Sequence, residues 1–493
     1  MASIVAIALT LMSAYIVNAI LPAFLLYIRQ KWIARNLPGP RTDFFFGNIL
    51  QFPKEYKDYR DYFLGFANEE IAKGHSVARL WVANQLFVYP LNSDATRAIT
   101  SSTVELNKGD VYSFVGRWLG KGLITIGNEE RWHRNRRLLT PAFHFAKLDE
   151  YIQTIDRHAR HLVQVIRQKC TTGQIDLYPI IKMCALDVIT DTAMGCHINA
   201  LEDSEHPYVR AVQKFNHLIY IRAMNPLLSI SLVWTYLGYE RESQKALKVL
   251  KDQTFQVVTE RIKQRKLEDA KPRPDFLDLL LDEFDKGTLP FEEICEEVDT
   301  FMFAGHDTTS HGISWILWAL ACHPEVQEQL YAELIDNFPS KEGLSAIKQK
   351  NLKYLDAVVK EGLRIFPAVP FVQRRLVNDL RMDGYLIPRG AQVTIAPYFL
   401  HHNPKVFANH MEFDPNNFLS GRDYESNAYI PFSSGMRNCI GQRFALYEMK
   451  IVVAYLVLNF TFSSAGLGFR ENYPTFEVIL QPSHGVPVIL EER

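Results

Sequence analysis

The sequence predicts a mostly helical protein with a small β component and one N-terminal membrane anchor. Three observations lead to this fold class: long amphipathic segments in the middle of the chain, a few short strand patterns, and an uncharged apolar N-terminus. The 493 residues, 47% of them hydrophobic, can bury a large core. The net charge of −1 argues against a nucleic-acid-binding protein, because such a protein carries a strongly basic domain.

The first 28 residues form the candidate anchor. They contain no charged side chain, and as a helix rising about 1.5 Å per residue they would span the roughly 30 Å hydrocarbon core of a bilayer. A cleaved signal peptide would carry its positive residues before the apolar stretch, whereas Arg29, Lys31 and Arg35 follow it. The positive-inside rule then leaves the rest of the chain in the cytosol. We expect an anchor at 1–28, a basic and proline-rich linker at 29–40, and one domain at 41–493.

Helical periodicity dominates residues 147–366, and the longest predicted helix runs from Pro290 to Cys322. Its first turn combines proline with acidic residues, which suit a helix N-terminus. Strand patterns are short and lie outside this region: "VARLWV", "LFVYPL", "AQVTIAPY" and "VPVILE". The six cysteines show neither zinc-site nor disulfide-framework spacing, so reduced thiols are expected.

The long helix contains an unusual polar cluster. Gly305 lies in its middle, at a cost of roughly 1 kcal/mol relative to alanine, and His306, Asp307, Thr308 and Thr309 follow. A solvated face with a threonine bonding back to its own helix would explain the threonines. It does not explain a glycine next to Ala304. We therefore expect a shallow notch with an acid and an alcohol at its edge, and a flat, bulky group against that face.

The segment "PFSSGMRNCIGQRFA" at 431–445 carries the strongest chemical signal. It reads F-x-x-G-x-R-x-C-x-G, with Phe432, Gly435, Arg437, Cys439 and Gly441 at the fixed positions. A cysteine thiolate suits iron, and on haem it favours O–O bond cleavage. The glycines allow amide groups to approach and hydrogen-bond the sulfur. Phe432 would shield the sulfur from water, and the guanidinium of Arg437 would neutralise a haem propionate. We predict that Cys439 is the axial ligand of a haem iron.

At this point the chain resembles the cytochrome P450 family. Four further motifs agree, in the family's order: "WHRNRR", "AGHDTT", "EGLR" and "FDPNNF". The resemblance implies the cytochrome P450 fold and haem b as cofactor. It also implies a set of haem contacts, namely Trp132, Arg136 and Arg374 at the propionates and Ala304 and Gly305 against the ring. The E-x-x-R pair is expected to be structural and consists of Glu361 and Arg364.

The resemblance further implies an oxygen-dependent monooxygenase in the endoplasmic reticulum membrane, with its catalytic domain facing the cytosol. Asp307 and Thr308 are expected to deliver protons during oxygen activation. Electrons would come from NADPH through NADPH–cytochrome P450 reductase, with cytochrome b5 as a second candidate donor. The basic residues Arg134, Arg137, Arg443 and Lys450 are either simply solvated or form the docking patch for such a flavoprotein. No nucleic acid is expected as a partner.

Two positions depart from the family's pattern. Asn417 occupies the place where an arginine usually completes a triad with the E-x-x-R pair. Ala304 stands where many fatty-acid hydroxylases of the animal branch have a glutamate that esterifies haem, so no covalent haem ester is expected from this position.

The branch resemblance favours a fatty acid or related lipid as substrate, and sterols, hormones and foreign compounds stay open. Segments expected to line the pocket are apolar and aromatic: 112–126, 216–237, 301–309 and 368–372. Two other classes of protein compete with a monooxygenase. One is an oxygen-independent haem-thiolate isomerase or dehydratase, and the other is a non-catalytic haem sensor. The Asp307–Thr308 pair argues against both.

Overall fold

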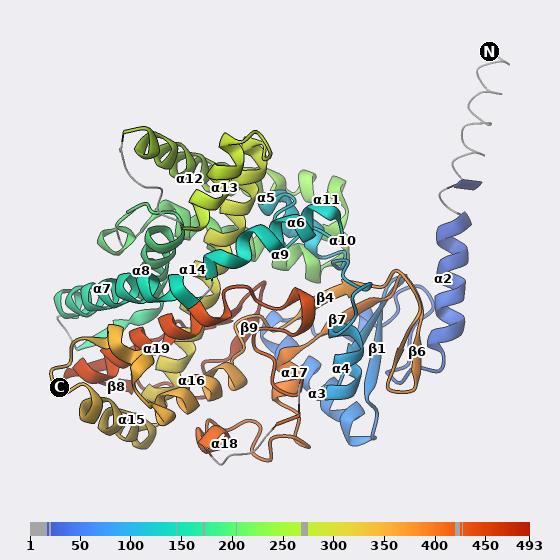
Figure 1. Ribbon diagram of the computed structural model, residues 1–493. Coiled ribbons are helices and arrows are strands. Elements are labelled where there is room, and N and C mark those ends of the chain that lie inside the picture. Colours follow the sequence, from blue (N-terminus) through green and yellow to red (C-terminus); the bar gives the residue numbers. More distant parts are fainter. Residues whose placement is uncertain are drawn as a thin grey trace.

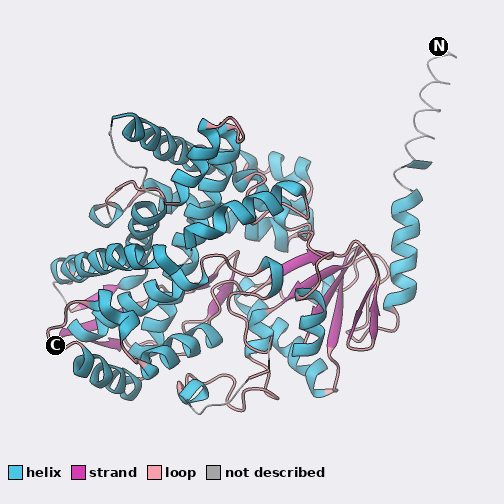
Figure 2. Ribbon diagram, viewed as in Figure 1, coloured by secondary structure: helices cyan, strands magenta, loops and turns pink. Residues whose placement is uncertain are grey.

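Helices form most of the chain, and the strands gather into several small sheets (Figures 1 and 2). The computed structural model describes residues 17–18, 21–143, 145–170, 173–203, 205–267, 275–419, 424–425 and 427–493. The predicted fold class, mostly helical with a minor β component, is confirmed. The helices are α2 (Leu21–Ala34), α3 (Tyr59–Ala72), α4 (Ser93–Thr100), α5 (Tyr112–Leu119), α6 (Glu130–Leu139), α7 (Phe145–Lys169), α8 (Leu177–Ala193), α9 (Pro207–Met224), α10 (Pro226–Ser229), α11 (Ser231–Tyr236), α12 (Tyr239–Leu267), α13 (Phe276–Asp285), α14 (Phe291–Cys322), α15 (Pro324–Asn337), α16 (Lys353–Ile365), α17 (Pro397–His401), α18 (Asn416–Leu419) and α19 (Gln442–Asn459).

All four predicted strand patterns become strands. The largest sheet has the order β1-β2-β7-β4, in which β2 and β7 run parallel and the other neighbours run antiparallel. A second sheet has the order β3-β11-β8. The strands are β1 (Val77–Val82), β2 (Gln85–Pro90), β3 (Gln174–Asp176), β4 (Val372–Arg375), β5 (Leu380–Met382), β6 (Tyr385–Ile387), β7 (Gln392–Ile395), β8 (Phe460–Ser464), β9 (Pro474–Phe476), β10 (Leu480–Pro482) and β11 (Pro487–Glu492).

The predicted long helix is α14, which crosses the middle of the molecule (Figure 1). Pro290 caps it in an extended conformation, as the sequence predicts. Small residues bring its neighbours close. A Cβ at Gly305 would lie 2.6 Å from Ile189 of α8, and one at Gly312 would lie 2.5 Å from Met449 of α19. Helix α14 therefore packs directly against the two helices that flank the candidate site.

The predicted membrane anchor at 1–28 lies largely outside the described residues. Within the part of the chain that is described, no helix is long and apolar enough to cross a membrane. The predicted linker begins as helix, because α2 continues to Ala34. Two of its basic residues attach that helix to the domain: Arg29 pairs with Asp379, and the Lys31 ammonium lies 4.0 Å from the centre of the Trp81 ring.

Candidate active site

The cysteine loop is a tight turn between Pro431 and α19. The Cys439 amide donates a hydrogen bond to the Phe432 carbonyl at 2.9 Å, which closes the loop. Gly435 has a φ of +71°, and a Cβ there would lie 1.8 Å from the Thr100 carbonyl oxygen. Only glycine fits this position. By contrast, the nearest atom to a Cβ at Gly441 would be 3.8 Å away, on the ring of Phe143.

The surroundings of the Cys439 thiol act on its pKa in opposite directions. Burial has the largest effect and raises the pKa overall, whereas a hydrogen bond from the Gly441 amide and the nearby charge of Arg136 oppose this shift. Helix α19 begins at Gln442, so its N-terminus points its partial positive charge toward the sulfur. Cys439 is nevertheless accessible. An accessible sulfur can ligate a haem iron.

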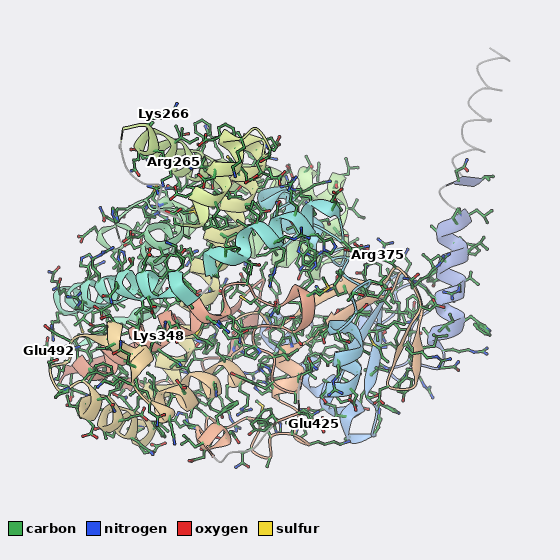
Figure 3. The ribbon with its side chains drawn as sticks, in the orientation of Figure 1. Arg265, Lys266, Lys348, Arg375, Glu425 and Glu492 are labelled. Carbon is green, nitrogen blue, oxygen red and sulfur yellow. The ribbon has the colours of Figure 1, made fainter. Side chains whose placement is uncertain are left out.

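Three cations meet beside this loop without an anionic partner. The three cations are Arg437, Arg374 and Lys108, and each lies close enough to the others to affect their pKa values. Within the described residues no carboxylate forms an ion pair with any of them. Burial together with the charge of Arg374 lowers the pKa of Arg437 to about 9. Burial and both guanidinium groups lower the pKa of Lys108 well below its usual value. Arg375, which follows Arg374 in the chain and is labelled in Figure 3, is exposed. It pairs with Asp110 at 2.9 Å.

The hydrogen bonds of Arg437 leave one donor without a partner. Its Nη2 donates to the Gly127 carbonyl at 2.6 Å, and its plane stacks 3.8 Å from the centre of the Trp132 ring. Its Nε is buried and makes no hydrogen bond to any residue that the structure describes. Buried cations that lack an anion are costly, so this cluster fits the two carboxylates of a haem. The sequence did not identify Lys108, which reaches the cluster only because it bridges to Arg374 in the fold.

Arg136 holds the loop itself. Its two Nη atoms donate to the carbonyl and the side-chain oxygen of Asn438, at 2.9 and 2.7 Å. The guanidinium thus fixes the residue before the cysteine and places a positive charge near the sulfur. Its predicted propionate contact, like the ring contacts predicted for Ala304 and Gly305, stays a prediction.

Helix α14 offers one accessible strip to the site. From Phe301 to Ala321 only Ala304, Gly305 and Thr308 are partly exposed, and they share one helix face. Thr308 Oγ1 donates to the Ala304 carbonyl at 2.6 Å, so this threonine does bond back to its own helix. Gly305 has a packing role that the sequence did not reveal, since Ile189 occupies the space of its missing side chain.

The strip and the cysteine loop approach each other at Phe143. Its ring stacks on that of Phe301 with a centroid distance of 5.6 Å, one turn before Ala304. The same ring is the nearest group to a Cβ at Gly441, two residues after Cys439. A flat cofactor bound between the strip and the sulfur would therefore have Phe143 at its edge.

Asp307 lies on the buried side of α14, away from the accessible strip. Its Oδ1 forms an ion pair with Lys182 Nζ of α8 at 2.9 Å, in a geometry too bent for a well-directed hydrogen bond. Asn216 Nδ2 of α9 donates to its Oδ2 at 2.8 Å. Burial alone would raise the pKa of Asp307, but Lys182 and then His311 hold it well below its usual value. The carboxylate is therefore anionic at neutral pH.

The E-x-x-R pair has the predicted structural role. Arg364 donates to both oxygens of Glu361 at 2.8 and 2.7 Å, and to the carbonyls of His401, His410 and Glu412. Asn417 Nδ2 donates to Glu361 at 3.1 Å, so a neutral amide completes the set where the family usually has a charge.

Comparison with known proteins agrees with this geometry. The sequence profile of the cytochrome P450 family matches residues 37–488. Human cytochrome P450 4V2 is 33% identical, with 99% of this chain and 95% of the relative covered. Cytochrome P450 4c21 of Blattella germanica is 34% identical over 94% and 95%, and cytochrome P450 4c3 of Drosophila melanogaster is 33% identical over 94% and 90%. The chain belongs to the cytochrome P450 family and is a haem-thiolate monooxygenase of the kind represented by these relatives. A redox partner and a small-molecule substrate follow from that membership.

Proposed function

We propose that this cytochrome P450 inserts one atom of molecular oxygen into a lipophilic substrate, with a fatty acid or related lipid as the leading class. The observation that carries the proposal is the accessible strip of α14, formed by Ala304, Gly305 and Thr308. The Phe143 ring lies next to both the helix turn before this strip and the cysteine loop. Aromatic side chains from three helices pack together on the buried side of α14. Trp118 of α5 lies 5.0 Å from Phe303 and 5.6 Å from Phe215 of α9, measured between ring centroids. The segments expected to line the pocket are themselves apolar and aromatic, which favours apolar substrates with few polar anchors.

In this proposal Cys439 ligates the haem iron, and Arg374, Arg437 and Lys108 hold the haem carboxylates. When bound, the haem supplies reductive activation of molecular oxygen with two electrons and two protons. The Asp307 carboxylate, which is anionic at rest, accepts a proton at Oδ1 and releases it again. The Thr308 hydroxyl, which now donates to the Ala304 carbonyl, is the nearest alcohol on the accessible strip and would pass the proton onward after rotating about χ1.

The electron donor that we propose is NADPH–cytochrome P450 reductase, with cytochrome b5 as a second donor. Of the four basic residues singled out for docking, Arg134 pairs with Glu293 and Lys450 pairs with Asp356. Arg137 and Arg443 are exposed, so an acidic partner can reach both of them. The proposed location is the endoplasmic reticulum membrane, which the exposed apolar side chains of α2 support: Leu21, Phe24, Leu25 and Trp32.

An oxygen-independent isomerase or dehydratase is the second candidate reaction class. It would need no external electrons, and it would not need an acid next to an alcohol on α14. Sterols, hormones and foreign compounds are the alternative substrates.

Two measurements test the proposal. The carbon-monoxide difference spectrum of the reduced protein should carry the thiolate signature, and Cys439→Ala should abolish it. The full chain, reconstituted with the reductase and NADPH, should then oxidise members of a panel of fatty acids, sterols and terpenoids, with products identified by mass spectrometry. Product formed from lipid peroxides without NADPH, and none with NADPH and oxygen, would establish the isomerase class instead.

A further inference from the structure

A line of buried polar side chains leads from Asp307 toward the protein surface. The Tyr178 hydroxyl lies 2.8 Å from His311 Nε2, and His311 Nδ1 lies 2.5 Å from the Asp307 carbonyl oxygen. The same Nδ1 is 3.6 Å from Asp307 Oδ1. His311 is fully buried, whereas Tyr178, at the first turn of α8, is partly accessible. Of these three positions, Tyr178 and His311 are used neither by the family motifs nor by the mechanism above.

We propose that Tyr178 and His311 form the proton-entry route that reprotonates Asp307, with Lys182 as the positioning residue that holds the carboxylate. The proposal rests on the proposed monooxygenase function, because only a proton-consuming reaction needs such a route. Tyr178 and His311 act through Asp307 and touch neither substrate nor cofactor.

The hydrogen-bond directions fit a relay. His311 Nδ1 faces a carbonyl oxygen, which only accepts, so Nδ1 carries the proton and Nε2 accepts from the Tyr178 hydroxyl. In the transfer, the Tyr178 O–H bond breaks as an N–H bond forms at Nε2. His311 Nδ1 then turns from the Asp307 carbonyl toward Asp307 Oδ1, which lies 3.6 Å away, and the Nδ1–H bond breaks as an O–H bond forms at Oδ1. Tyr178 then regains a proton from solvent, so that one proton enters and no charge is left on the route.

The charges around the route support neutral carriers. Burial lowers the pKa of His311 to about 4. The Asp307 charge opposes this shift and the Lys182 charge adds to it, so the ring is neutral near pH 7. Burial raises the pKa of Tyr178 well above its usual value, with Asp307, Glu477 and Asp176 adding to the effect. Glu477 faces the outer end and pairs with the exposed His217 at 3.3 Å. Lys182 lies 5.2 Å from the centre of the Tyr178 ring and pairs with Asp307 at the inner end.

A purely structural role is the alternative, since the same contacts tie α8 to α14. Two variants separate the two roles. Tyr178→Phe removes the outer hydroxyl and keeps the ring. His311→Gln keeps a donor and an acceptor on the side chain but has no second tautomer, so it can bond without passing a proton. The matched control is Tyr208→Phe. The Tyr208 hydroxyl is buried, has no hydrogen-bond partner among the described residues, and belongs to a ring packed against His306 of α14.

The experiment uses the full-length holoenzyme with reductase and the best substrate from the lipid panel. Product formed per NADPH should fall about tenfold in Tyr178→Phe and in His311→Gln, with a larger solvent deuterium isotope effect and an unchanged KM. Hydrogen–deuterium exchange at the His311 ring, followed by mass spectrometry in the resting protein, should slow several-fold in Tyr178→Phe, while exchange at His306 stays constant. Tyr208→Phe should match the wild type in every measurement.

Wild-type coupling and isotope effect in His311→Gln would overturn the proposal, as would equal losses in Tyr178→Phe and Tyr208→Phe. A fall in coupling that is accompanied by a lower melting temperature in both relay variants would also overturn it, in favour of the structural role. Failure of the proposed function is distinguishable, because the wild-type protein itself would then form no product with NADPH and oxygen.

Discussion

At the residue scale, the cations near the cysteine loop say more about the cofactor than the cysteine does. A lone accessible thiol is compatible with many roles. Arg374 is buried and Arg437 and Lys108 are half-buried, and none of them forms an ion pair with a carboxylate among the described residues, so this cluster favours a multivalent anion. Lys108 is the most informative of them, since burial and two neighbouring guanidinium groups both disfavour its charged form. The two negative charges of a dianionic cofactor would offset the repulsion among all three cations.

Replacing Lys108 with methionine should loosen haem binding. A hydrogen bond to a charged group contributes about 1.5–3 kcal/mol, so haem should dissociate about 10- to 100-fold faster. Transfer of haem to an excess of an apo-globin, followed by absorbance, measures this rate. Arg375→Met is the matched control, because this neighbouring cation is exposed and already has a carboxylate partner. Equal dissociation rates in the two variants would remove Lys108 from the cofactor site.

Thr308 and Thr309 provide a second comparison between adjacent residues. Thr308 lies on the accessible strip, while Thr309 is buried and its hydroxyl has no hydrogen-bond partner in the described part of the chain. Thr308→Ala should therefore lower product per NADPH about tenfold and release hydrogen peroxide. Thr308→Ser should keep most of the coupling because it keeps the hydroxyl. Full product yield in Thr308→Ala would contradict the assigned role, and Thr309→Ala should leave coupling unchanged.

At the scale of the element, α14 must combine close packing with an open face. Gly305 serves the packing, since a Cβ there would meet two carbons of Ile189 at 2.6 Å. A β-branched side chain in a helix has little rotamer freedom and cannot easily move away. The clash outweighs the roughly 1 kcal/mol that alanine would gain in helix propensity.

Gly305→Ala should consequently destabilise the protein by about 1–2 kcal/mol, given the usual cost of overpacking. In an Ile189→Ala background the same substitution should become stabilising by up to about 1 kcal/mol, because the clashing carbons are gone. Denaturant unfolding of the four proteins of this cycle measures both effects. An effect of the same size and sign in both backgrounds would show that Ile189 is not the reason for the glycine.

Helix α14 also contains an acid whose titration should make stability fall with rising pH. Burial raises the pKa of Glu297 to about 7, although the Asn135 amide donates to it at 2.8 Å. Between about pH 4.5 and 7 the folded state keeps this proton and the unfolded state does not, so stability decreases across that window by about 3 kcal/mol. Asp275, whose pKa burial likewise raises to about 7, adds to the trend.

Unfolding of the holoenzyme at pH 5 and pH 8 measures this loss. Glu297→Gln mimics the protonated side chain and should reduce the difference between the two pH values by about 2–3 kcal/mol. Glu292→Gln, at an exposed position in the first turn of α14, is the control. An unchanged pH dependence in Glu297→Gln would mean that the acid ionises in the folded protein as it does in the unfolded chain.

At the scale of the whole molecule, periodicity and local motifs were sufficient for the elements and for the cysteine loop. The long helix, predicted from Pro290 to Cys322, is observed from Phe291 to Cys322, and "VARLWV" is β1 without a shift. Lys108, Lys182 and the Tyr178–His311 pair were missed because their partners are more than a hundred residues away. Lys182 did leave a signal, as the one charge in the apolar run "PIIKMCAL". Such a charge must find a buried partner, but the sequence does not say which one.

The exposed apolar side chains suggest how the whole molecule meets a membrane. Helices α2, α10 and α11 lie toward the same side of Figure 1, and β8 lies toward the opposite side. Leu232 and Tyr236 of α11 are 80% and 87% exposed, and the segment between α2 and α3 exposes Phe44, Phe45 and Phe46. A monomeric soluble protein rarely gathers so many exposed apolar residues, whereas a surface that lies on lipid needs them.

A fluorophore attached at Leu232→Cys in the full chain should therefore be quenched by spin-labelled lipids when the protein binds phosphatidylcholine vesicles. The control is Ile489→Cys on β11, which pairs with β8 on the far side and is also exposed. Because both proteins keep the same N-terminus, an anchor at 1–28 would attach them equally, and only the orientation of the domain separates their signals. Lipid contact at position 232 predicts strong quenching there and little at 489, together with a blue-shifted emission. Equal quenching at the two positions would mean that the domain tumbles freely at the membrane and that α11 does not rest on it.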